Sequence, residues 1–160
     1  MTDRQLLAVV EDAMPRIEYR HFQLVDDGAR VEAPDGWARS PQMVVAAGHG
    51  AILRTGGNDF YPLVRVEVWS AQPGPQDPSL WEVVEEVDLR SDSGSLLLRE
   101  WDGGPVGDPL PVERSGSYRL KAHCRGRAEA EALIGDELYY EGVEEWLLQL
   151  WPLDEVDCPE

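Results

Sequence analysis

The sequence predicts an all-β protein in which two antiparallel sheets pack face to face as a sandwich of jelly-roll type, with at most one or two short helices. Three observations support this fold class. Short runs of β-favouring residues recur, and turn signals follow at intervals of about 8–12 residues. Apolar and polar residues alternate in several runs, as expected for strands with one buried face. The 15 glycines and 12 prolines are scattered as turn residues, and no strand–helix–strand alternation appears.

The first half of the chain contains four predicted strands. Residues 3–14 are compatible with a short helix or a first strand, and the Leu-Leu-Ala-Val-Val run slightly favours a strand. Residues 16–25 form a β-rich run that an Asp-Asp-Gly turn closes. Residues 43–47 and 51–55 are short apolar strands, and the Gly-His-Gly sequence between them is typical of a tight turn.

The middle of the chain alternates more regularly. In residues 63–70 three valines share one face, and Arg, Glu and Trp lie opposite. Residues 81–89 repeat this pattern, so we expect Trp81 to lie in the core. Residues 95–101 form the next predicted strand, and residues 110–114 are compatible with a short edge strand.

The last part of the chain contains two strands around a short helical segment. Residues 118–125 place Tyr, Leu, Ala and Cys on one face and four basic or histidine residues on the other. Residues 128–134 have helical propensity but are few. Residues 145–151 form the last predicted strand, with Trp146, Leu148 and Leu150 sharing an apolar face.

The length of 160 residues fits one domain. We expect residues 1–152 to form a single β-sandwich domain and residues 153–160 to form an acidic C-terminal tail. The two cysteines, Cys124 and Cys158, are too few for a disulfide framework. The first 15 residues include three acids, which is wrong for a secretory leader, and we expect a cytoplasmic protein.

The charge distribution is the most unusual feature of the sequence. The formal net charge is −17, which argues against binding to nucleic acid or to anionic membranes. Residues 128–160 contain 11 acids and no base, whereas five of the 14 bases lie in residues 114–127. One interpretation is a solvated acidic surface, with the bases paired to neighbouring acidic strands. The alternative is a surface for a basic protein partner, comprising Glu129, Glu131, Asp136, Glu137, Glu141, Glu144 and Glu145.

Three of the six tryptophans fall on the faces opposite the predicted core: Trp69, Trp101 and Trp151. Exposed aromatic rings are suited to stacking on sugars or to binding a protein, so these residues form a possible ligand platform. The alternative is that loops or the ends of the sandwich cover them.

No catalytic pattern stands out. Nucleophilic catalysis needs Ser or Cys beside an oriented His, and the sequence has no Gly-x-Ser-x-Gly elbow. His123 and Cys124 are strand neighbours that point to opposite faces, so they cannot share a metal ion. Cys124 should face the core as an inert apolar residue. We therefore expect no enzyme activity, no metal and no cofactor.

The order of the predicted strands indicates a family. Tyr19 to Phe22 lie in an early strand, Gly50 to Ile52 open a later one, and Gly116 to Leu120 begin a late strand with a Gly-x-Tyr-x-Leu motif. This layout, over residues 16–125, resembles the competence protein J family of small acidic inhibitors of a DNA-entry nuclease, and related bacterial β-sandwich proteins. Residues 144–152 do not match that pattern.

The resemblance implies a cytoplasmic protein that binds and silences a nuclease or toxin. A carbohydrate-binding module that uses the exposed tryptophans, or a structural interaction domain, is the alternative function.

Overall fold

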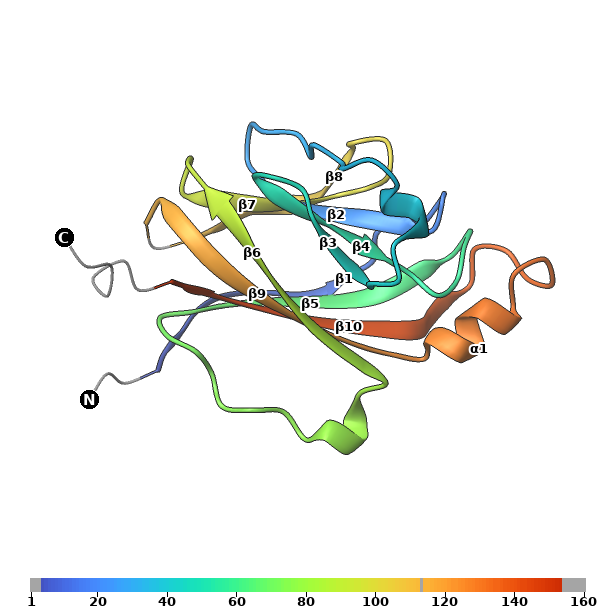
Figure 1. The fold of residues 1–160 in the computed structure, drawn as a ribbon. Coiled ribbons are helices and arrows are strands. Elements are labelled where there is room, and N and C mark those ends of the chain that lie inside the picture. The colour runs from blue at the N-terminus through green and yellow to red at the C-terminus, as the bar shows by residue number, and fades with distance from the viewer. Residues whose placement is uncertain (1–3, 113, 154–160) are drawn as a thin grey trace.

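The computed structural model describes residues 4–112 and 114–153, whose strands form two facing sheets of five strands each (Figure 1). The first sheet contains, in spatial order, β1 (Leu6–Ala13), β5 (Tyr61–Trp69), β10 (Glu141–Pro152), β9 (Gly116–Arg125) and β6 (Val83–Ser91). The second contains β3 (Val44–Ala46), β4 (Gly50–Arg54), β2 (His21–Asp26), β7 (Ser95–Arg99) and β8 (Pro105–Pro111). The helical elements are η1 (Trp37–Arg39), η2 (Pro78–Leu80) and α1 (Arg127–Ala132). The predicted all-β sandwich of two sheets is confirmed, and residues 3–14 contain a strand.

The pairing of the strands differs from the prediction in one place. β10 runs parallel to β5, with Leu148 opposite Val66, so the expectation of purely antiparallel sheets is wrong for this pair. Parallel neighbours need a long crossover, and the four strands between β5 and β10 in the chain provide it. β8 also begins earlier than predicted; its prolines are tolerated because it is the last strand of its sheet. The jelly-roll type stays a prediction.

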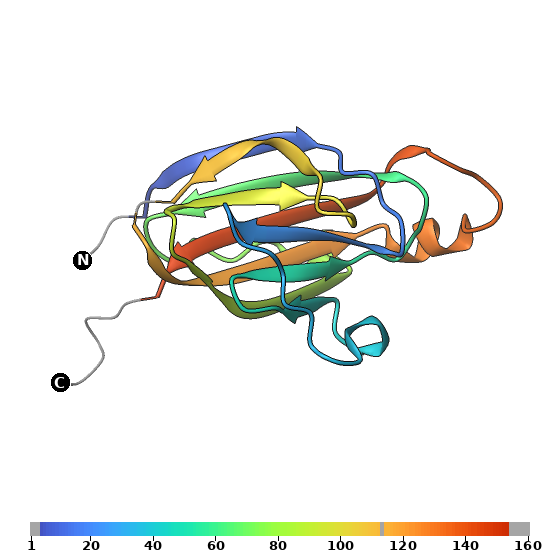
Figure 2. The same cartoon turned by 90° about the horizontal axis from the view of Figure 1, so that it is seen from above.

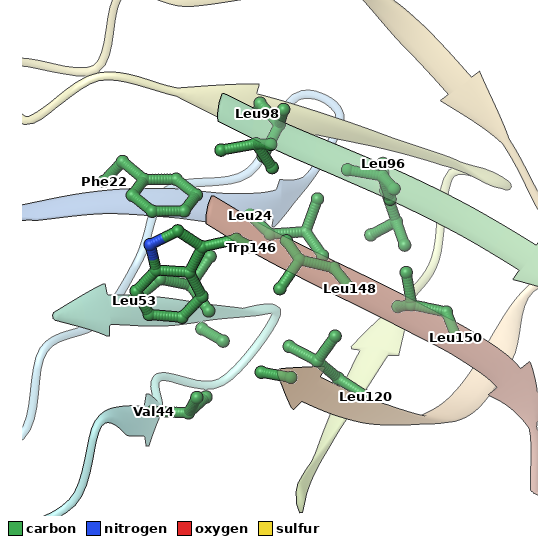
Figure 3. Packing of buried hydrophobic residues seen from close by; sticks show 14 of the residues in the cluster. Phe22, Leu24, Val44, Leu53, Leu96, Leu98, Leu120, Trp146, Leu148 and Leu150 are labelled. Atoms are coloured by element: carbon green, nitrogen blue, oxygen red, sulfur yellow. The ribbon is translucent and has the colours of Figure 1, made fainter. Parts of the chain in front are cut away.

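The core lies between the two sheets, and β10 is the central strand of the first sheet, from which it supplies core side chains (Figure 3). Trp146, Leu148 and Leu150 point from β10 toward the second sheet, as the period-2 pattern predicts. The ring of Trp146 meets Phe22 edge-on, with 5.3 Å between the ring centroids. Cys124 is fully buried in the same cluster, and burial raises the pKa of its thiol. The thiol therefore stays protonated and unreactive, as predicted.

Long connections cover parts of the outer faces of both sheets. The sequence pattern predicted that Trp81 lies in the core, and this is wrong. Trp81 precedes β6, at the end of the 70–82 connection. Its ring lies 5.4 Å from that of His123 and 4.8 Å from the guanidinium of Arg125, both on the outer face of β9. The alternation fails at Trp81 because the strand begins only at Val83.

None of the helices in the described ranges is long and apolar enough to cross a membrane. The predicted acidic tail, apart from Leu153, lies outside the described residues, and so does Cys158.

Candidate protein-binding site

α1 and the segment that links it to β10 project beyond the ends of both sheets (Figures 1 and 2). Five of the predicted partner-binding acids are exposed there, and we call them the acidic end: Glu129, Glu131, Asp136, Glu137 and Glu141. Glu131 forms an ion pair of 3.5 Å with Arg20. The other four carboxylates have no ion-pair partner among the described residues, so their charge is available to a partner.

Large apolar side chains lie within the acidic end. Ile134, Leu138 and Tyr139 are 40%, 64% and 46% exposed, and we call these three residues the apolar tip. Protein interfaces typically combine a few aromatic or aliphatic anchors with a polar rim, and the apolar tip with its surrounding carboxylates has this composition. The sequence analysis missed this tip, although a Leu-Tyr-Tyr run between two glycines in an acidic segment was a visible signal.

The backbone holds Tyr139 in an unfavourable conformation. Its φ of 58° lies in the left-handed region, which costs a non-glycine residue about 1–3 kcal/mol. Its N–H donates to the carbonyl oxygen of Asp59 at 2.6 Å. The guanidinium of Arg16 donates to its hydroxyl at 3.2 Å and lies 5.1 Å from its ring centroid. These contacts fix the position of the ring at the surface.

Glu144 lies in the interior, so its predicted place on the binding surface is wrong. It is 0% exposed, and its Oε1 accepts from the N–H groups of Gly56 at 2.9 Å and Gly57 at 3.2 Å. Its Oε2 accepts from the indole N–H of Trp146 at 2.8 Å and lies 3.7 Å from the Arg127 guanidinium. Burial raises the pKa of Glu144, although these partners partly oppose the shift. The contacts of its carboxylate fasten the 55–58 loop to β10 and α1.

Close packing against the 55–58 loop supports the acidic end from below. A Cβ atom on Gly57 would lie 2.8 Å from the Cβ of Ala130, the buried residue of α1. Tyr140 stacks on Phe60 with 5.1 Å between the ring centroids, and its hydroxyl donates to the Ala130 carbonyl at 3.2 Å. The tip therefore stands on a rigid base, which lowers the entropy cost of binding.

Glu145 and the basic face of β9 pair with each other across the first sheet. The guanidinium of Arg125 lies 2.7 Å from the Glu145 carboxylate, which is only partly exposed. Arg119 pairs with Glu86 at 3.0 Å and also with Asp88. The proposed pairing of bases with neighbouring acidic strands is thus present at these positions, and Glu145 does not belong to the acidic end.

The three tryptophans of the predicted platform do not come together. Trp69 and Trp151 belong to neighbouring strands of the first sheet, whereas Trp101 follows β7 of the second. Trp151 is only 6% exposed, so it offers no ring face to a ligand. The indole N–H of Trp69 donates to Glu67 at 2.8 Å. Trp101 is partly exposed beside the ring of Tyr19, at 5.0 Å between centroids.

No group of three or more His, Cys, Asp or Glu side chains is arranged to hold a metal ion in the part of the chain that the structure describes.

The sequence matches no family model and no curated protein. The structure is similar to that of ComJ from Bacillus subtilis, an inhibitor of the DNA-degrading activity of NucA, with a TM-score of 0.64 at 10% identity. That match covers 95% of this chain and 100% of ComJ. The chain has a ComJ-like fold. The product of crocagin biosynthetic gene J is also similar, with a TM-score of 0.53 and 17% identity over 96% of this chain and 100% of the other. The predicted resemblance is therefore confirmed at the level of the fold.

Proposed function

We propose that this chain is an inhibitor-type binding protein that acts in the cytoplasm and docks a basic protein, such as a nuclease or toxin, through the acidic end and its apolar tip. It is a binding protein and not an enzyme. The observation that carries the proposal is the exposure of Leu138 and Tyr139 among four carboxylates that have no ion-pair partner in the described chain. The ComJ-like fold supports it, because ComJ inhibits a nuclease.

The two parts of the surface have different tasks. The carboxylates of the acidic end steer a basic partner and raise the association rate, an effect that salt weakens. The side chains of Leu138 and Tyr139 lose contact with water in the complex and slow its dissociation. Nucleases carry basic grooves for the phosphates of their substrates, so an acidic projection is suited to occupying such a groove.

The first test identifies the partner and asks whether the acidic end binds it. The chain is immobilised, incubated with the native cytoplasm at low salt and eluted with a salt gradient. The same experiment uses the double variant Glu137→Lys/Glu141→Lys. The matched control is Asp35→Lys/Asp108→Lys, which makes the same change in net charge at two exposed acids elsewhere on the surface.

We expect the wild type and the control to retain the same basic protein to moderate salt, and the acidic-end variant to release it at low salt. Equal retention by all three proteins would show that the acidic end is not part of the binding surface. Capture of no basic protein by the wild type would contradict the proposed function as a whole.

A further inference from the structure

An open cavity of about 500 Å³ lies on the outer face of the second sheet, between the segment 28–31 and the turn that follows β7. The side chains that give it chemical character are Gln23, Arg30, Arg99, Trp101 and Asp102. Its volume is in the range of sites that enclose small organic molecules. None of these residues belongs to the acidic end or to the apolar tip.

Gln23 supplies a polar amide group to this cavity. Its neighbours Phe22 and Leu24 point into the core, so the period of the strand turns Gln23 to the outer face. Only 7% of Gln23 is exposed, and no described residue forms a hydrogen bond with its side-chain amide. The amide atoms of Gln23 are not among the buried polar atoms that have no partner, so they are open to solvent at the cavity, where a ligand can replace water as their hydrogen-bond partner.

Arg99 lies directly opposite Gln23 in the register of β2 and β7, on the same outer face. Its Nη1 donates to the carbonyl of Gly103 at 2.7 Å, which fixes the guanidinium. Its Nε is buried and has no partner within the described chain. The guanidinium of Arg99 is therefore fixed beside the cavity, and a planar guanidinium of this kind is suited to pairing with a carboxylate ligand.

The charges around the cavity set the charge of its ligand. Neither Arg99 nor Arg30 forms an ion pair with any described residue, in a chain that has 31 acids and 14 bases. The carboxylate of Asp102 also lines the cavity and accepts from the N–H of Gly104 at 2.9 Å. Two arginines and one aspartate leave one positive charge in excess, which favours a monoanion over a polyphosphate.

We propose that this cavity binds a small organic monoanion in which a carboxylate is joined to a planar ring. The carboxylate pairs with the guanidinium of Arg99, and the amide of Gln23 completes its hydrogen bonds. The ring packs against Trp101, which stands beside Tyr19 and forms the aromatic wall. The site does not depend on the proposed inhibitor function.

The test uses the ¹⁵N-labelled full chain and three probes with this chemistry: benzoate, phenylacetate and indole-3-acetate. Binding is followed by the shifts of the Trp101 indole N–H and of the Gln23 side-chain amide. We expect at least one probe to bind with a Kd of about 1 mM, in keeping with its few atoms. The corresponding neutral amide should bind at least about tenfold more weakly, since it cannot pair with the guanidinium.

Substitution of the arginine tests the assignment independently. Arg99→Met should weaken binding at least about tenfold, whereas Arg39→Met, an exposed arginine of η1 outside the cavity, should leave it unchanged. The comparison of carboxylate with amide needs no variant, so it decides the matter even if Arg99→Met does not fold. No saturable shift with any carboxylate, equal binding of acid and amide, or equal binding by a folded Arg99→Met protein would each overturn the proposal.

Discussion

Replacement of Glu144 by alanine tests the role of this buried carboxylate. The substitution leaves four donors without their acceptor: the N–H groups of Gly56 and Gly57, the indole N–H of Trp146 and the thiol of Cys124. It also leaves the guanidinium of Arg127 without the carboxylate that lies 3.7 Å away. Each hydrogen bond to a charged group contributes about 1.5–3 kcal/mol, but the variant also avoids the cost of burying the charge. Breaking a buried pair typically costs about 3–5 kcal/mol, and we expect Glu144→Ala to lower the free energy of unfolding by this amount.

The neighbouring residue provides the control. Glu145→Ala removes only the ion pair with Arg125, in which the side chains of Glu145 and Arg125 are 38% and 41% exposed. It should therefore lower the free energy of unfolding by only about 0–1 kcal/mol. Urea denaturation of the wild type and both variants measures the two values. Glu144→Gln, which keeps an acceptor for the glycine N–H groups, should fall between them. If Glu144→Ala and Glu145→Ala destabilise the protein equally, Glu144 does not fasten the 55–58 loop as argued.

Three further predictions concern the base of the acidic end, a buried histidine and the apolar tip. Gly57→Ala should lower the free energy of unfolding by about 1–3 kcal/mol, because the new Cβ meets that of Ala130 at 2.8 Å; an unchanged urea midpoint would show that α1 moves freely. Burial lowers the pKa of His123 below 6.5, so on acidification the unfolded chain takes up a proton at this residue before the folded protein does. The stability that neutral His123 contributes is therefore present above pH 6.5 and is lost as the pH falls through the folded-state pKa. The destabilisation caused by His123→Gln should therefore shrink on acidification, and urea titrations that show it constant or growing would refute this. The double variant Leu138→Ala/Tyr139→Ala should weaken binding to the captured partner by about 2–4 kcal/mol, mainly through faster dissociation. The stability of the folded variant should be nearly unchanged. Equal affinity of the variant and the wild type in titration calorimetry would exclude the apolar tip from the interface.

Local alternation explains why most strands could be predicted. β5 and β9 of the first sheet each bury one face and show the period of two in their sequences, as Val64, Val66 and Val68 do in β5. The parallel contact of β5 with β10 could not be predicted in this way, because pairing between distant segments leaves no local pattern. The juxtaposition of Gln23 with Arg99 is hidden for the same reason.

The position of Glu144, by contrast, was open to prediction. It precedes Trp146 by two residues, so the same period that sends Trp146 to the core also turns Glu144 inward. The run of acids in this region concealed the alternation, because Glu144 and Glu145 look alike in composition. For Trp81 the alternation misleads, because Trp81 continues the alternating pattern of β6 in the sequence but lies before the first residue of that strand.

The central claim is that the acidic end silences a basic partner, and inhibition of that partner tests it most directly. The activity of the captured protein, DNA cleavage in the case of a nuclease, is measured against increasing amounts of the wild type, of Glu137→Lys/Glu141→Lys and of Asp35→Lys/Asp108→Lys. The proposed function predicts that the wild type and the Asp35/Asp108 control inhibit equally, whereas the acidic-end variant needs at least about tenfold more protein. Equal inhibition by all three proteins, or no inhibition by the wild type, would contradict the claim.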